Sequence, residues 1–264
     1  MEVTAPFGYV GGVVLGATAT AGRFAVFLVR LGRDLIPGLR YGRLILQQAR
    51  FIGVGSMPLV ILTSFFIGGV AALQTAYQMQ GTMPLIYVGT VIAKSVFIEL
   101  GPVLTAIVVG ARVGSSFAAE IGTMRVTEQI DALETLAIRP IRFLAVPRLV
   151  AAVVMLPVIT VFADLIAILG GMVVSVARVG LSVTTYTRGM KLFFDADDIY
   201  GGLIKSCVFG AIIAIEGCFH GFQTRGGAEG VGIATTNAVV SSCVMILVMD
   251  YFLAEVIFRL IFPA

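Results

Sequence analysis

Long apolar stretches follow one another along the chain and are separated by short polar segments. A helix needs about 20 predominantly apolar residues to cross the hydrocarbon core of a bilayer. Five stretches reach this length, at 54–77, 85–111, 146–176, 199–222 and 232–262. Pro157 lies within the third stretch, which a membrane helix tolerates where neighbouring helices satisfy the freed backbone groups. The pattern therefore predicts five transmembrane helices.

The first 50 residues follow a different pattern. Residues 5–22 are apolar but rich in glycine, and apolar side chains then recur at helical spacing, at Phe24, Leu28, Leu31 and Leu35. Arginines occupy the other faces of this predicted helix, at Arg23, Arg30 and Arg33. Such a helix is typical of the membrane interface, with its arginines toward lipid phosphates. We expect an interfacial region over 1–50 and a transmembrane domain over 51–264; the alternative is a sixth spanning helix over 5–29.

The sequence EIGTMRVTEQIDALETLAIRP (120–140) separates the second and third apolar stretches. Apolar side chains recur there at spacings of four, three and four, at Val126, Ile130, Leu133 and Ala137. Carboxylates form a second row, at Glu128, Asp131 and Glu134. Pro140 should end the helix, because the residue before proline is driven out of the α region. The pattern predicts a short amphipathic helix over 120–139, either packed on its own protein or held in a groove on another one.

Composition supports a membrane protein. Of the 264 residues, 58% are hydrophobic and 12% are charged, whereas soluble domains are about half apolar and about a quarter charged. The net charge of +3 is small and dispersed, so it does not favour a nucleic-acid partner. The three cysteines lie within apolar stretches and lack metal-binding spacing, which argues against a disulfide framework or a zinc site.

The distribution of basic residues predicts the orientation. If the N-terminus is cytoplasmic, the cytoplasmic side carries six arginines within 23–50, five within 112–148 and Arg225. The opposite side then carries only Arg178, Arg188, Lys191 and Arg259. Cytoplasmic loops carry an excess of lysine and arginine. We therefore expect a cytoplasmic N-terminus and a periplasmic C-terminus.

Ionisable residues lie within the apolar stretches, at Glu99, Asp164, Lys205, Glu216 and Asp250. Each costs about 2.5–3.5 kcal/mol on insertion scales, and such residues usually mark a transport pathway. They fit an ion-coupled secondary transporter, but that class usually shows paired repeats, and the two halves of this chain show no convincing similarity. Small residues pair in the first two spans, at Gly68 and Gly69 and at Gly110 and Gly114, where we expect close helix packing.

Motifs for catalysis are missing from the sequence. There is no G-x-x-x-x-G-K-[ST] phosphate loop, so ATP is not expected to bind to this chain. Neither G-x-S-x-G nor H-E-x-x-H occurs, and His220 is the single histidine. We expect no enzyme activity, no metal and no cofactor in this chain.

The region ELGPVLTAIVVGARVGSSFAAEIGTMRVTEQIDALETLAIRPIRFLAVPRLVA (99–151) resembles the signature region of MlaE-type permeases, also called YrbE-type. These proteins are the membrane subunits of ABC transporters that work with MCE proteins. The similarity continues in SMPLVILTSFFIGGVAALQ (56–74), LIKS (203–206), GIATTNAVVSS (232–242) and MDYFLAEVIF (249–258).

This resemblance implies an all-α integral membrane protein in which 120–139 is a cytoplasmic coupling helix seated in a groove on the ATPase. The coupling residues would be Glu120, Arg125, Glu128, Ile130, Asp131, Leu133 and Glu134. Glu99, Lys205 and Asp250 match charged positions of the family. We expect these three residues to line or gate the lipid pathway; the alternative is that they pair with one another and lock the helices. Outside the family pattern, Lys94, Asp164 and Glu216 are expected near helix ends or in local pairs.

The resemblance also implies partners and a location. The partners would be a second copy of the chain, an ABC ATPase that binds ATP and Mg, a periplasmic MCE-domain protein and a STAS-domain protein on the ATPase. The substrate would be membrane phospholipid, moved between the membranes of a diderm bacterium or of a plastid. The chain would then lie in the inner membrane.

Overall fold

The computed structural model describes residues 5–81, 83–193 and 195–261, which form helices joined by short turns and contain no strand. An N-terminal helix, α1 (Ala5–Gly38), precedes five helical runs that are long and apolar enough to cross a membrane. These runs are α2 (Gly42–Met79), α3–η1–α4 (Tyr87–Ser95, Val96–Leu100, Gly101–Val126), η2–α6–η3 (Ile141–Ala145, Val146–Val174, Ser175–Val179), α8 (Ala196–Phe222) and α9 (Gly227–Ile261). The predicted all-α membrane protein with five spans and an N-terminal helix is confirmed. Residues 1–4 and 262–264 of the predicted regions lie outside the described residues.

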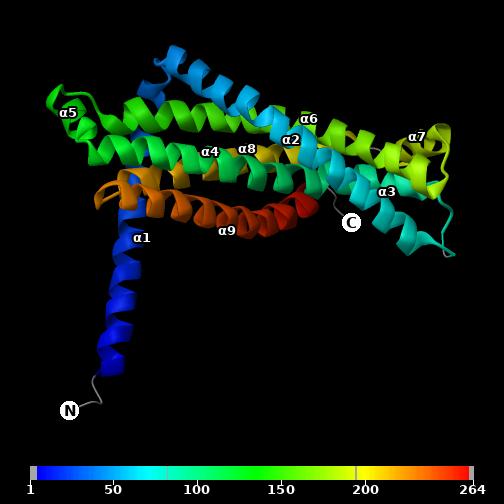
Figure 1. Cartoon of the computed structure of the whole chain (residues 1–264), viewed down its shortest axis with the longest axis horizontal. Coiled ribbons are helices and arrows are strands. Elements are labelled where there is room, and N and C mark those ends of the chain that lie inside the picture. Colours follow the sequence, from blue (N-terminus) through cyan, green and yellow to red (C-terminus); the bar gives the residue numbers. More distant parts are fainter. Residues whose placement is uncertain (1–4, 82, 194, 262–264) are drawn as a thin grey trace.

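The five spans run side by side along the long axis of the molecule (Figure 1). Two short helices mark the ends of this bundle: α5 (Gln129–Thr135) lies at one end, and α7 (Val183–Leu192) lies at the other. α1 crosses the α5 end at a steep angle to the spans, and its N-terminal part extends beyond them (Figure 1). The bundle axis is the direction that would cross a bilayer, so α1 has the direction of a helix lying in the interface.

The spans α2 and α6 approach each other most closely where both carry glycine. A Cβ added at Gly68 would lie 1.8 Å from the carbonyl oxygen of Ala167, and one added at Gly170 would lie 2.2 Å from that of Phe65. Each glycine therefore lies directly against the backbone of the other helix. Larger side chains at either position would force these two spans apart.

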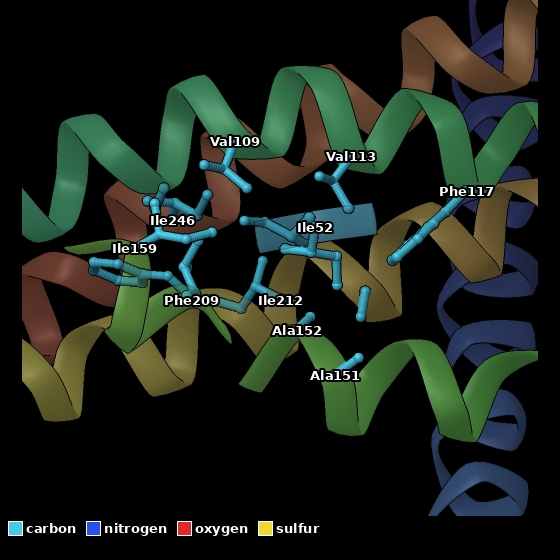
Figure 2. Close-up of a cluster of buried hydrophobic side chains, with 14 of the residues drawn as sticks. Ile52, Val109, Val113, Phe117, Ala151, Ala152, Ile159, Phe209, Ile212 and Ile246 are labelled. Carbon is cyan, nitrogen blue, oxygen red and sulfur yellow. The ribbon is translucent and has the colours of Figure 1, made fainter. Parts of the chain in front are cut away.

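Apolar side chains from four spans fill the centre of the bundle. Ile52 of α2, Val109 of α4, Ile159 of α6 and Phe209 of α8 are all at most 1% exposed and belong to one cluster (Figure 2). A second cluster at the α5 end joins Phe27 of α1 to residues of α4, α5, α6 and α8. The C-terminal half of α1 is thus part of the packed protein.

Two spans contain a π-helical turn two residues before a proline. η1 precedes Pro102 and η2 precedes Pro147. Proline has no N–H to donate to the fourth residue before it, and its ring crowds that carbonyl. In the wider turn, the backbone N–H of the residue before each proline still donates a hydrogen bond. The Gly101 N–H bonds to the Val96 carbonyl, and the Val146 N–H bonds to the Ile141 carbonyl. Each proline is therefore accommodated without ending its span.

The segment between the second and third spans differs from the prediction. We predicted one amphipathic helix over 120–139, but α4 continues to Val126 and α5 covers only Gln129–Thr135. Glu128 (φ 59°) and Ala137 (φ 58°) adopt left-handed conformations, which interrupt a right-handed helix. Backbone bonds from Ala137 N–H to Glu134 and from Ile138 N–H to Leu133 close α5 in a Schellman motif. The helix therefore ends before Pro140, which begins the next helical run instead.

Candidate functional site

Three charged side chains from three different spans meet inside the bundle. Glu99 lies in the π-turn η1, Lys205 lies in α8, and Asp250 lies in α9. Lys205 is nine residues after Ala196, where α8 begins, so it lies roughly 14 Å along that helix from the α7 end. The site is therefore at membrane depth, and a π-turn, a feature that occurs frequently at functional sites, carries one of its members.

The distances define a cluster in which one lysine forms ion pairs with two carboxylates. Lys205 Nζ lies 2.6 Å from Glu99 Oε1, to which it donates a hydrogen bond, and 2.9 Å from Asp250 Oδ1. The second contact is an ion pair without the angles of a hydrogen bond, and Asp250 Oδ1 accepts no other bond from the described residues. We call these three residues the Lys205 cluster.

The Lys205 cluster is asymmetric in charge and in exposure. Two carboxylates face one ammonium, so the ionised cluster carries one surplus negative charge. The Lys205 side chain is 1% exposed, whereas those of Asp250 and Glu99 are 20% and 38% exposed. The surplus charge therefore lies on the outer side of the protomer, where contact with lipid tails would be costly.

Other charges within the spans are arranged differently. Glu216 lies 3.5 Å from His220 one helical turn away and so forms the expected local pair. Lys94 lies in the last turn of α3, near a helix end as expected, but its Nζ pairs with Asp198 of α8 at 3.2 Å, across two spans. Asp164 lies in the middle of α6 and has no ion-pair partner among the residues that the structure describes, which contradicts our expectation of a local pair. Its Oδ1 occupies the space that a side chain at Gly101 would need.

At the α5 end, the predicted coupling residues divide into buried and exposed groups. Ile130 is 3% exposed and packs with Phe27 and Leu144, while Leu133 is partly buried beside the same cluster. Glu128 and Glu134 are exposed. The apolar face therefore fastens α5 to its own protein, and the acidic face points away from it.

Ion pairs occupy the remaining predicted coupling residues. Arg125 Nη1 lies 2.5 Å from Asp131 Oδ1, and both side chains are largely exposed. Glu120 Oε2 accepts a hydrogen bond of 2.7 Å from Arg148, whose side chain is 7% exposed. Glu120 thus joins α4 to the start of α6, while Arg148 also lies over the Phe117 ring.

A buried carboxylate fastens α1 to this end of the bundle, and sequence reasoning missed it. Asp34 accepts hydrogen bonds from Arg142 (2.7 Å from Nη2) and Arg139 (3.1 Å). Burial raises the pKa of Asp34, but the two guanidinium groups outweigh burial and hold that pKa below its ordinary value. The sequence contained one signal of this pairing. Asp34 is an acidic residue in a helix whose other charged residues are arginines, and the acidic segment is followed by Arg139 and Arg142.

The four predicted packing glycines differ in how tightly they are enclosed. Gly68 touches the backbone of α6, and a Cβ on Gly69 would lie 3.0 Å from Val174. A Cβ on Gly110 would lie 3.3 Å from Ile213, and one on Gly114 would make ordinary contacts at 3.7 Å or more. The contact of α2 with α6 therefore depends on glycine more strongly than that of α4 with α8.

Comparison with known proteins gives one consistent result. Residues 45–256 match the permease MlaE family. A probable ABC transporter permease of Rickettsia bellii is 40% identical over 90% of this chain and 92% of the relative, and one of Synechocystis is 42% identical over 81% of each. The protein TRIGALACTOSYLDIACYLGLYCEROL 1, chloroplastic, of Arabidopsis thaliana is 37% identical over 85% of this chain and 64% of the relative.

These matches cover the spans, the Lys205 cluster and α5 together. A family match over most of the chain and relatives of 40% identity are sufficient to assign the chain to a family. The helical bundle, with its short polar segment between the second and third spans, agrees with that assignment. The chain belongs to the MlaE permease family and is an ABC transporter permease, a transporter subunit rather than an enzyme.

Proposed function

We propose that this permease moves glycerophospholipids between membranes, together with a periplasmic MCE-domain protein. The observation that carries the lipid assignment is the similarity to the chloroplast protein, because its name contains that of a glycerolipid. The Lys205 cluster supports the same assignment. A lipid has a charged or polar headgroup and apolar chains, and a polar cluster among apolar spans offers a place for each part.

The working unit in this proposal is a homodimer. The carboxylates of the Lys205 cluster lie partly exposed on one protomer, at 38% for Glu99 and 20% for Asp250. In contact with lipid tails these groups would be costly. A second copy related by a two-fold axis would cover them and enclose a path between two identical clusters. In this arrangement Glu99 and Asp250 would line or gate that path.

Energy in this proposal comes from a separate ATPase that binds ATP and Mg, with a STAS-domain protein attached to it. The exposed acidic face of α5 supports a contact with that partner, since an amphipathic helix held by its apolar face can present the other face to a groove. The α5 end would be cytoplasmic and the α7 end periplasmic, in the inner membrane of a diderm bacterium. This orientation is supported by the excess of arginines at the α5 end.

Reconstitution of the assembled complex tests the proposal. The chain is purified from native membranes with the proteins that accompany it, and its mass is measured to count the copies of each. The complex is placed in liposomes with a fluorescent phospholipid, and transfer to acceptor vesicles is followed. We expect two copies of this chain and transfer that needs hydrolysable ATP. A single copy would refute the dimer, and transfer driven by an ion gradient without ATP would support the ion-coupled alternative.

A further inference from the structure

A groove of about 850 Å³ lies at the α5 end, between α1 and the connection from α4 to α6. One wall comes from α1, and the other comes from α5 and the residues that follow it. The end of α8 forms the floor, where Phe219 and Phe222 pack against Phe27 of α1 at ring distances of 5.8 and 6.0 Å. The Lys205 cluster is not part of this groove.

The groove is strongly basic. Its walls carry five arginines against two carboxylates, which leaves three positive charges: Arg23, Arg30, Arg33, Arg125 and Arg139 against Asp34 and Glu134. Asp34 is already paired with Arg139, and Arg125 is paired with Asp131 beside the groove. Arg23, Arg30 and Arg33 form no ion pair within the described residues, and all three are exposed. The unbalanced charge is therefore concentrated on the α1 wall.

The position and the lining of the groove indicate what would bind there. α1 crosses the α5 end of the bundle at a steep angle to the spans (Figure 1). With the spans across a bilayer, the groove at this end would open at the level of the lipid headgroups. Val26 and Phe27 of α1 and Ile141 add apolar surface beside the arginines. A ligand that combines an anionic group with an apolar body matches this lining better than a small soluble anion, which has no apolar part to bury.

We propose that this groove binds an anionic phospholipid from the leaflet at the α5 end, with its phosphate against Arg23, Arg30 and Arg33. The apolar floor holds the first part of the acyl chains. The lipid lies between α1 and α5 and therefore connects the interfacial helix to the segment that faces the ATPase. This site is separate from any transported lipid, and its occupancy does not depend on whether the proposed transport function is correct.

Brominated lipids test this proposal, because the chain contains no tryptophan and a single one can be introduced. Phe222→Trp places the reporter in the groove, and the purified full-length chain is inserted into phosphatidylcholine liposomes, where this tryptophan is the single one present. Dibrominated phosphatidylglycerol or dibrominated phosphatidylcholine is then added at equal mole fraction. Since each basic residue near an anionic surface contributes about fivefold, we expect phosphatidylglycerol to be preferred at least about tenfold. The Arg23→Gln/Arg30→Gln/Arg33→Gln variant should lose this preference.

Matched controls separate the site from general attraction to the membrane. Arg40→Gln/Arg43→Gln/Arg50→Gln removes the same charge from exposed positions outside the groove and should keep the preference. Tyr251→Trp, on the exposed surface of α9, should be quenched equally by both lipids. Equal quenching at Phe222→Trp, or equal loss of preference in both triple variants, would refute the site. Displacement of the lipid by millimolar inorganic phosphate would show that the groove binds a soluble anion and would refute the lipid assignment.

Discussion

At the scale of single residues, charge counting distinguishes the members of the Lys205 cluster. Removal of one carboxylate leaves a neutral pair, whereas removal of Lys205 leaves two carboxylates with no other cation of the described residues within ion-pair distance. Breaking a buried ion pair by deleting one partner costs about 3–5 kcal/mol, mainly because a charge is left uncompensated. Lys205 is therefore expected to matter for stability as well as for the proposed gating.

The first prediction follows from this asymmetry. Lys205→Met should lower the yield of folded complex strongly, whereas Glu99→Gln and Asp250→Asn should preserve yield and lower ATP-dependent lipid transfer. Yield is measured by size-exclusion chromatography and transfer is measured in liposomes. Glu255→Gln, which alters an exposed carboxylate of α9, is the control and should change neither quantity. Loss of yield in both carboxylate variants, restored in the triple variant Glu99→Gln/Lys205→Met/Asp250→Asn, which leaves no charge uncompensated, would show a purely structural cluster.

The second prediction concerns the glycines. Gly68→Ala should destabilise the protein by about 1–3 kcal/mol, because the added methyl group meets the Ala167 carbonyl and the two spans must separate. Gly114→Ala should change stability little, since its nearest contacts would be ordinary ones. The midpoint of thermal unfolding, followed by a thiol-reactive dye on the buried Cys218, measures both. Equal midpoints for the two variants would contradict the close contact of α2 with α6.

The third prediction concerns pH and Asp34. Because the pKa of Asp34 is lowered in the folded protein, its contribution to stability is complete above the unfolded pKa of about 3.9. It is lost as the pH falls through the lower folded pKa. Asp34→Asn should therefore unfold at a lower temperature than the wild type at pH 6, and the difference should shrink as the pH falls below about 4.

The exposed carboxylate of Asp131 gives the control for this comparison. It also pairs with an arginine, but the pair is open to solvent, and exposed pairs contribute about 0–1 kcal/mol. Asp131→Asn should accordingly have a small effect at every pH. A difference between Asp34→Asn and wild type that stayed constant from pH 6 to pH 3 would rule out ionisation of Asp34 as its cause.

At the scale of helices, the sequence predicted the spans better than their interruptions. Apolar stretches of about 20 residues have one stable solution in a bilayer, so all five spans were predictable. The end of α5 was not predictable from the sequence. A Schellman motif usually has glycine at its left-handed position, whereas here Ala137 occupies that position. The π-turns before Pro102 and Pro147 were also missed, although proline within an apolar stretch is itself a sign of an altered turn.

Pairings between helices were less predictable than the helices themselves. The residue types of the Lys205 cluster indicated a site, but sequence spacing could not show that one lysine would lie between two carboxylates from other spans. The buried pairing of Asp34 with Arg139 and Arg142 joins positions more than 100 residues apart, and periodicity within one helix carries no information about such contacts. Only the packing of α1 across the bundle end brings them together.

The fourth prediction concerns α5 as an element. Glu128→Lys/Glu134→Lys reverses two exposed charges and leaves the Arg125–Asp131 pair in place. Copurification with the ATPase should weaken by about tenfold at low salt, since exposed charges at an interface mainly steer association, and the difference should shrink at high salt. Asp195→Lys/Asp197→Lys, at the α7 end, makes the same charge change and should leave copurification normal. Unchanged copurification at every salt concentration would mean that these acids face only solvent.

At the scale of the whole molecule, the bundle has different structures at its two ends. The α5 end carries α1, the basic groove and the exposed acids of α5, whereas the α7 end carries α7 packed on α3 and the Lys94–Asp198 pair. The Lys205 cluster lies between them. The two ends of the bundle therefore offer different surfaces to partners.

The π-turn η1 also sets the rotational phase of the span that contains it. Before the turn, Thr90 bonds to the Gly189 carbonyl of α7 and Lys94 faces Asp198; after it, α4 packs on α8 and α9. An α-helix rotates by about 100° per residue, so insertion of one alanine after Ile98 would turn one half of the span against the other. We expect the insertion to separate α3 from α7 and to lower the unfolding midpoint more than Ile98→Ala does, because the two halves could no longer both face their present neighbours.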